Sequence, residues 1–115
     1  MTNPVVEVLT FEDCPHAQPA LELVERVVGE LGLDATVRRI DVPDLETAET
    51  HRFLGSPTIR VNGRDVEPGA EERSEFVLSC RVYRTGGSLK GEPDERWLRE
   101  ALIATSTPLP RCAET

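Results

Sequence analysis

Apolar residues follow two different spacings along the chain, which divide it into short strands and longer helices. Residues 4–11 (PVVEVLTF) are dense in β-branched side chains, which predicts a buried first strand. Residues 15–31 repeat apolar positions every three or four residues, which is typical of a helix with one buried face. That face consists of Ala17, Ala20, Leu21, Val24, Val27, Val28 and Leu31. We expect Gly32 to end this helix, and Pro19 to bend it at the cost of one backbone hydrogen bond.

The middle of the chain predicts a second strand, a short helix and a hairpin. Residues 35–42 (ATVRRIDV) form the strand, although two adjacent arginines interrupt its apolar alternation. A helix over 44–54 follows. Its inward-facing residues are Leu45, Ala48 and Phe53. Residues 56–61 form a third strand that ends at Asn62-Gly63, a dipeptide with a strong hairpin preference.

The second half of the chain predicts a loop, a fourth strand and a final helix. Residues 64–75 (RDVEPGAEERSE) are acidic and contain Pro68-Gly69, which indicates a solvated surface loop. Residues 76–84 (FVLSCRVYR) predict the strand, and a helix over 93–104 follows. The strand presents Phe76, Leu78, Cys80 and Val82 on one face, and the helix buries Leu98, Ala101 and Leu102. Residues 105–115 lack periodicity and are expected to form a disordered tail.

The predicted order of elements is β-α-β-α-β-β-α, within one α/β domain over residues 1–104. Crossover connections make the first two strands parallel, whereas the third and fourth strands form an antiparallel pair. The expected architecture is therefore a mixed central sheet of about four strands, flanked by helices on both faces.

Charge and composition exclude several classes of partner. The chain carries 13 Lys and Arg against 21 Asp and Glu, a net charge of −8. Because nucleic acids and anionic membranes attract basic patches, we expect neither as a partner. No apolar run is long enough to span a bilayer, and residues 1–4 lack the layout of a secretory signal. We therefore expect a cytoplasmic location; no cofactor is expected, and the oligomeric state stays open.

Cys14 stands where the first predicted strand ends and the first helix begins. A helix start presents unpaired backbone N–H groups and the positive end of the helix dipole, which favour a thiolate over a thiol. Pro15 suits this position because its missing N–H is one that the helix leaves unpaired. Cys14 is therefore the candidate catalytic nucleophile.

The element order resembles the thioredoxin fold over residues 4–104, together with Cys14-Pro15-His16-Ala17 and Ser56-Pro57-Thr58. The resemblance implies that Pro57 is a cis-proline and that its loop binds the extended backbone of a partner. The residues that it places around the substrate are Pro15, His16, Ser56, Pro57 and Thr58. Members of this superfamily carry Cys-x-x-Cys at the first helix. Here Ala17 replaces the second cysteine.

A narrower similarity links the chain to small bacterial thioredoxin-like proteins, some of which are labelled relatives of alkylmercury lyase. It rests on residues 55–63 (GSPTIRVNG), 79–83 (SCRVY) and the Gly91-x-Pro93 turn. This similarity keeps a soft metal ion such as mercury or copper(I) among the possible ligands. Structural zinc normally needs four ligands with closely spaced cysteine pairs, which the chain lacks, so no metal site is predicted.

Without a second cysteine at residue 17, Cys14 is left to act as a monothiol. It can attack a disulfide or accept a small thiol, and an external thiol then completes the cycle. The expected partners are proteins or low-molecular-weight thiols and disulfides. The alternative is a non-catalytic thioredoxin-fold adaptor, or a binder of mercury or copper(I).

The other cysteines and the two histidines leave further alternatives open. Cys80 is either a buried core thiol or a second thiol that resolves adducts on Cys14. Its predicted strand begins at the end of the sheet away from Cys14, which favours the core thiol. Cys112 is interpreted as an exposed thiol in the tail. His16 is expected to be solvated and to orient Cys14, and His51 to lie on the surface. The single tyrosine and tryptophan are interpreted as packing residues.

Overall fold

The computed structural model describes residues 3–85 and 87–106. The strands are β1 (Val5–Thr10), β2 (Thr36–Asp41), β3 (Thr58–Val61), β4 (Arg64–Asp65), β5 (Tyr83–Thr85) and β6 (Ser88–Lys90). The helices are α1 (Ala17–Leu31), α2 (Leu45–Thr50) and α3 (Glu95–Ser106), with a 3-10 turn, η1, at Ala70–Glu72. None of the described helices combines the length and the hydropathy needed to cross a membrane.

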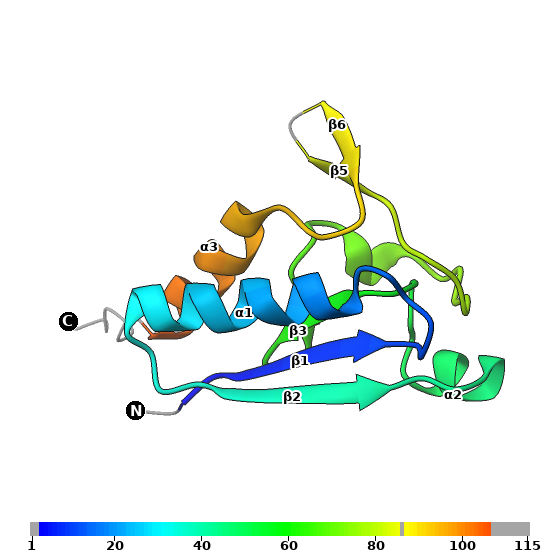
Figure 1. The fold of residues 1–115 in the computed structure, drawn as a ribbon, viewed down its shortest axis with the longest axis horizontal. Helices are drawn as coiled ribbons and strands as arrows, with labels where there is room; N and C mark the ends of the chain where they lie inside the picture. Colours follow the sequence, from blue (N-terminus) through cyan, green and yellow to red (C-terminus); the bar gives the residue numbers. More distant parts are fainter. Residues whose placement is uncertain (1–2, 86, 107–115) are drawn as a thin grey trace.

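Four strands form the central sheet in the order β2-β1-β3-β4. Figure 1 shows β2, β1 and β3 side by side. β1 and β2 are parallel, whereas β3 runs antiparallel to both β1 and β4. The predicted mixed sheet with a parallel first pair is therefore confirmed. The β3–β4 hairpin turns at Asn62 (φ 53°) and Gly63 (φ 85°), which supply the two left-handed positions of a type I′ turn.

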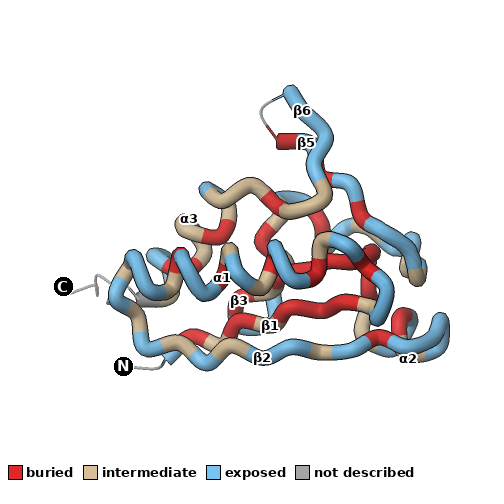
Figure 2. The backbone as a smooth tube through the Cα atoms, viewed as in Figure 1, coloured by how far each residue is buried: buried red, intermediate tan, exposed pale blue. Residues whose placement is uncertain are grey.

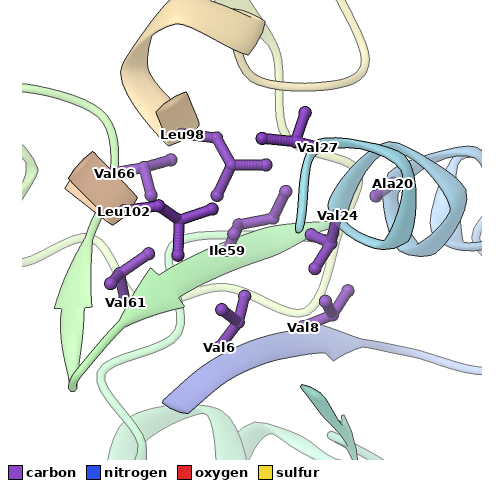
Figure 3. Close-up of a cluster of buried hydrophobic side chains, with 10 residues drawn as sticks. All are labelled: Val6, Val8, Ala20, Val24, Val27, Ile59, Val61, Val66, Leu98 and Leu102. Carbon is purple, nitrogen blue, oxygen red and sulfur yellow. The ribbon is translucent and has the colours of Figure 1, made fainter. Parts of the chain in front are cut away.

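Two apolar clusters lie on opposite faces of this sheet. On one face, side chains of α1 and α3 meet those of β1 and β3 (Figure 3). This cluster consists of Val6, Val8, Ala20, Val24, Val27, Ile59, Val61, Val66, Leu98 and Leu102. The other face carries a smaller cluster beside α2, formed by Leu9, Val42, Ala48 and Phe53. Because successive strand residues point to opposite faces, neighbouring residues of β1 serve both clusters.

The strand β2 forms one edge of the sheet and is largely exposed, whereas β1 and β3 are largely buried (Figure 2). Arg38 and Arg39 are both exposed on it. The edge position explains why this strand accepts two consecutive arginines.

The helix α1 begins at Ala17, two residues later than predicted, with His16 as its N-cap. The Ala20 N–H donates a hydrogen bond to the His16 carbonyl oxygen (3.0 Å). Pro19 therefore lies in the first turn, where a helix leaves its N–H groups unpaired anyway. The expectation that Pro19 removes one helical hydrogen bond is wrong for this reason. Gly32 ends the helix in the left-handed conformation (φ 67°), as predicted.

The prediction of a strand over 76–84 is wrong for most of its length. Residues 76–82 are irregular apart from one bridge at Cys80, and β5 pairs with β6 in a separate two-stranded sheet. The predicted face is inverted over residues 80–83, where Arg81 and Tyr83 are buried while Cys80 and Val82 are exposed. Phe76 and Leu78, on the same predicted face, are half-buried. Apolar alternation fails here because the inward side of the segment carries an arginine whose charge is paired.

The acidic segment 64–75 is likewise more than a solvated loop. It opens with β4, and it buries Val66 and Ala70. Asp65 and Glu67 direct their carboxylates at Arg81. These two acids therefore belong to the interior of the fold.

The bounds of α2 and α3 also differ from the prediction. α2 ends at Thr50 because Arg52 adopts a left-handed conformation (φ 54°). Leu45, in its first turn, is 53% exposed rather than buried. α3 extends to Ser106, and residues 107–115 of the predicted tail lie outside the described residues.

Candidate active site

Cys14 lies in the turn that joins β1 to α1. Its N–H donates to the Phe11 carbonyl oxygen, and its carbonyl oxygen accepts from the Ala17 N–H, both over 3.2 Å. The residue is buried, with 7% of its surface exposed. Cys14 therefore precedes α1 by three residues, whereas the predicted helix begins directly after it.

The Ser56-Pro57-Thr58 segment lies at the same edge of the sheet as Cys14. This edge is formed by the ends of the central strands and not by the edge strand β2. Because β3 is antiparallel to β1, the start of β3 adjoins the end of β1, and Thr58 pairs with Leu9. The Phe11 N–H donates to Ser56 Oγ over 3.4 Å, and the Ser56–Pro57 peptide bond is cis. All three residues of the segment are buried. The topology thus brings together the two segments that the sequence singled out.

A third segment joins this edge, and sequence reasoning placed it elsewhere. The Ser56 N–H donates to the Ser79 carbonyl oxygen, and the Arg81 N–H donates to the Ser56 carbonyl oxygen, both over 2.8 Å. These bonds form a parallel bridge that pairs Ser56 with Cys80. The N–H and the carbonyl oxygen of Ser56 are therefore both hydrogen-bonded to residues of this chain. The resemblance implies that the backbone of a partner binds at this place.

Cys80 is exposed and lies next to Cys14, so the prediction of a buried core thiol is wrong. Desolvation of its thiol, the charge of Cys14 and a hydrogen bond between the two side chains raise the pKa of Cys80 above its ordinary value. The predicted strand direction places Cys80 away from Cys14. This argument fails because Cys80 lies in an irregular segment that pairs with Ser56. Cys112, the third cysteine, lies outside the described residues.

The segment around Cys80 is anchored by the buried side chain of Arg81. Its guanidinium donates to Asp65 Oδ2 (2.8 Å), to Glu67 Oε1 (2.5 Å) and to Thr58 Oγ1 (2.9 Å). The same group lies 4.4 Å from the centre of the Tyr83 ring, and burial raises the pKa of Tyr83. A paired, buried arginine thus fixes the residue that follows Cys80.

Sequence reasoning missed this anchor, although one signal for it exists. Asp65 and Glu67 are two residues apart, a spacing that places both side chains on one side of an extended chain. Such a pair can accept a planar guanidinium, which favours multiple contacts with carboxylates. Arg81, directly after Cys80, supplies this guanidinium, but apolar alternation predicts that its side chain points to solvent.

His16 is partnered rather than freely solvated. Its Nδ1 contacts a carboxylate oxygen of Glu92, and 41% of its side chain is exposed. A Cβ added at Gly91 would lie 2.5 Å from three atoms of the imidazole ring, so the ring rests directly on this glycine. The turn before α3 therefore positions His16. His51 is half-buried, and its carbonyl oxygen accepts from the Arg60 guanidinium (2.6 Å).

The two single aromatic residues pack together. Tyr83 is fully buried, and its ring centre lies 6.1 Å from that of the half-buried Trp97. In residues 3–85 and 87–106, no group of three or more His, Cys, Asp or Glu side chains is placed to hold a metal ion.

The chain is similar to two curated proteins, although no protein-family model matches it. It is 34% identical over 72 residues to a Probable Thioredoxin of Methanothermobacter thermautotrophicus, covering 62% of this chain and 85% of that protein. It is 36% identical over 76 residues to a Probable Thioredoxin of Methanothermobacter marburgensis, covering 63% and 89%. The chain belongs to the thioredoxin-like superfamily.

The thioredoxin-like fold accounts for how the site is assembled. The four-stranded mixed sheet brings the end of β1 and the start of β3 to one edge, and helices cover both faces. Cys14 and Pro57 flank that edge in this thioredoxin-like protein. The narrower similarity to alkylmercury lyase relatives stays a prediction.

Proposed function

We propose that this thioredoxin-like protein catalyses thiol–disulfide exchange, with Cys14 as the nucleophile. The observation that supports this proposal is the position of Cys14 in the β1–α1 turn, at the sheet edge that also carries Pro57. Its partners are proteins or low-molecular-weight molecules that contain a disulfide or a thiol. The cytoplasm is the proposed location, because its thiol pool keeps such a cysteine reduced.

The partner contacts divide into an exposed set and a supporting set. Pro15 is exposed and His16 is half-buried, so these two residues meet the partner directly. Ser56, Pro57 and Thr58 are buried and support the wall behind the thiol. Because only 7% of Cys14 is exposed, a disulfide in a small or extended partner fits this site better than one inside a folded domain.

The first chemical step exchanges one disulfide bond for another, with no net oxidation or reduction. The Cys14 thiolate attacks one sulfur of the partner, a mixed disulfide forms, and the other sulfur leaves as a thiolate. In a monothiol cycle, an external thiol attacks the mixed disulfide and returns Cys14 to the reduced state. The chain provides the place for the exchange, and the external thiol provides the reducing electrons.

A mixed-disulfide reduction assay tests this proposal. Wild-type protein is given a glutathionylated peptide with glutathione as reductant, and the release of peptide thiol is followed over time. We expect turnover in the wild type and the uncatalysed rate in Cys14→Ser. Thermal unfolding of both proteins verifies that the variant is folded.

The adaptor alternative predicts the opposite outcome of that assay. If folded wild-type protein and Cys14→Ser release the peptide thiol at the same slow rate, the catalytic proposal is wrong. Binding of copper(I) or mercury that is lost in Cys14→Ser would then support a thiophilic metal binder.

A further inference from the structure

We propose that Cys80 is the resolving thiol of this protein, and that Cys14 and Cys80 alternate between a dithiol and an intramolecular disulfide. This inference rests on the proposed role of Cys14 and extends it from a monothiol to a dithiol site. It assigns to a residue of another segment the task that Ala17 cannot perform.

The β-bridge at Ser56 carries the main geometric argument. Ser56 Oγ accepts a hydrogen bond from Phe11, three residues before Cys14, and Ser56 itself pairs with Cys80. Neighbouring chains in such a pairing lie about 4.8 Å apart, and paired residues point to the same side. Cys80 is therefore held on the side of the bridge that faces the Cys14 turn.

The Cys80 thiol also responds to Cys14, which helps to raise its pKa. Cys14 acts on Cys80 both through its charge and through a hydrogen bond between the side chains. Cys14 is buried and Cys80 is exposed, so the pair extends from the sheet edge to solvent. The bridge at Ser56 keeps Cys80 close to a disulfide formed on Cys14, and proximity favours Cys80 in the second attack.

The placement of Cys80 is fixed by its neighbours on both sides. A Cβ added at Gly55 would lie 2.9 Å from Arg81 Cβ and 3.2 Å from the Ser79 carbonyl oxygen. The Gly55 backbone thus packs directly on the residues before and after Cys80. The buried ion pair between Arg81 and Asp65 (2.8 Å) holds the same segment from its other side.

The second step balances as follows. The Cys80 thiolate attacks the Cys14 sulfur of the mixed disulfide, and the bond from Cys14 to the partner breaks. The partner leaves as a thiolate and takes up a proton, while a Cys14–Cys80 disulfide forms. Two electrons have then passed from this chain to the partner's original disulfide. An external dithiol, or two molecules of a monothiol, reduces the pair again.

Peptide mapping under oxidising conditions gives the first test. Cleavage after arginine separates the three cysteines, because Cys14 lies in residues 1–26, Cys80 in 74–81 and Cys112 in 112–115. After oxidation with glutathione disulfide and blocking of free thiols, we expect residues 1–26 to be linked to 74–81. Linkage of 1–26 to 112–115 instead would overturn the proposal.

Release of a glutathione adduct gives the second test. With glutathione disulfide as probe and no other thiol present, we expect wild type to form the internal disulfide and to release glutathione. In Cys80→Ser the adduct on Cys14 should persist, with release slowed at least about tenfold. Cys112→Ser is the matched control and should release glutathione at the wild-type rate. Because Cys80 is exposed, serine should leave the fold intact, which circular dichroism verifies.

The outcomes separate this proposal from the one on which it rests. If Cys80→Ser acquires no adduct at Cys14, the nucleophilic role of Cys14 fails, and the dithiol cycle fails with it. If the adduct forms on Cys14 and leaves at the wild-type rate, only the role of Cys80 fails. Rapid adduct formation on Cys80 in Cys14→Ser would reverse the two roles and overturn the assignment.

Discussion

The hydroxyl of Tyr83 donates a hydrogen bond to the carbonyl oxygen of Pro57 over 2.6 Å, although the two residues are 26 positions apart. Both residues are buried. The bond connects β5, outside the central sheet, to the segment that flanks Cys14. It therefore ties the shape of the candidate active site to a strand that belongs to a separate two-stranded sheet.

Removal of this hydroxyl should destabilise the protein moderately. Tyr83→Phe keeps the ring and leaves the buried Pro57 carbonyl without this donor, which costs about 1–3 kcal/mol. Urea unfolding followed by circular dichroism measures the change. Tyr83→Ala also removes a fully buried ring and should cost about 3–5 kcal/mol. Equal losses in the two variants would show that the hydroxyl contributes everything and the ring nothing, contrary to this prediction.

Replacement of Arg81 should be among the most damaging single changes. Arg81→Met leaves the carboxylates of Asp65 and Glu67 without the buried cation that faces them, at a cost of about 3–5 kcal/mol. The matched control is Arg84→Met, because Arg84 is exposed, and its effect should lie within about 0.5 kcal/mol.

A compensating variant makes the Arg81 prediction sharper. Asp65→Asn and Glu67→Gln, added to Arg81→Met, remove the unpaired charges and should recover part of the lost stability in urea unfolding. If the triple variant is no more stable than Arg81→Met, uncompensated charge is not the cause of the loss.

Two glycines should respond in opposite directions to alanine. Gly55 has a φ of +126°, and an added Cβ would overlap Arg81 Cβ at 2.9 Å, so Gly55→Ala should destabilise by more than about 1 kcal/mol. Gly29 lies within α1 with nothing within 4 Å of an added Cβ. Gly29→Ala should therefore stabilise by about 0.5–1 kcal/mol. Thermal unfolding of both variants tests the pair, and a shift of the same sign in both would contradict the prediction.

The ion pairs between α1 and α3 predict a specific loss of stability in acid. Hydrogen bonds from Arg26 (2.7 Å) and Arg99 (2.6 Å) lower the pKa of Glu95 from 4.5 to about 2. A carboxyl whose pKa is lower in the folded state adds stability above its unfolded pKa and loses it as pH falls through the folded value. Glu95 therefore stabilises the fold above about pH 4.5, and this contribution disappears as pH approaches 2.

Thermal midpoints across this pH range test the role of Glu95. Glu95→Gln should lower the midpoint at neutral pH, and its difference from wild type should vanish near pH 2. Because these side chains are exposed to solvent, high salt should shrink the difference at neutral pH. Glu100→Gln, at another exposed position of α3, is the control and should follow the wild-type pH dependence.

The regular part of the fold could be predicted from the sequence because local rules and tertiary packing agree there. The apolar stripe of α1, the end of that helix at Gly32 and the turn at Asn62-Gly63 all correspond to the structure. Each of these signals depends on spacing or on backbone conformation within a few residues. The placement of Cys14 and Pro57 at one sheet edge depends on no such local signal; the resemblance to the thioredoxin fold implies it, and the pairing of β1 with β3 agrees with it.

The segment that contains Cys80 could not be predicted in this way. Its inward side is fixed by Arg81, whose partners Asp65 and Glu67 lie 16 and 14 residues earlier in the chain. Hydrophobic patterning assigns an arginine to solvent unless its partners are already known. The error in the direction of one side chain inverted the face predicted for residues 80–83, and it hid the approach of Cys80 to Cys14.

The exposed edge strand β2 has a consequence for how copies of this chain meet. An uncovered edge offers unpaired backbone groups to any other extended chain, and lengthening of the sheet in this way leads to aggregation. Arg38 and Arg39 place two positive charges on that edge, so a second copy aligned against it would bring like charges together. The two arginines that obscure this strand in the sequence thus discourage the folded protein from extending its own sheet.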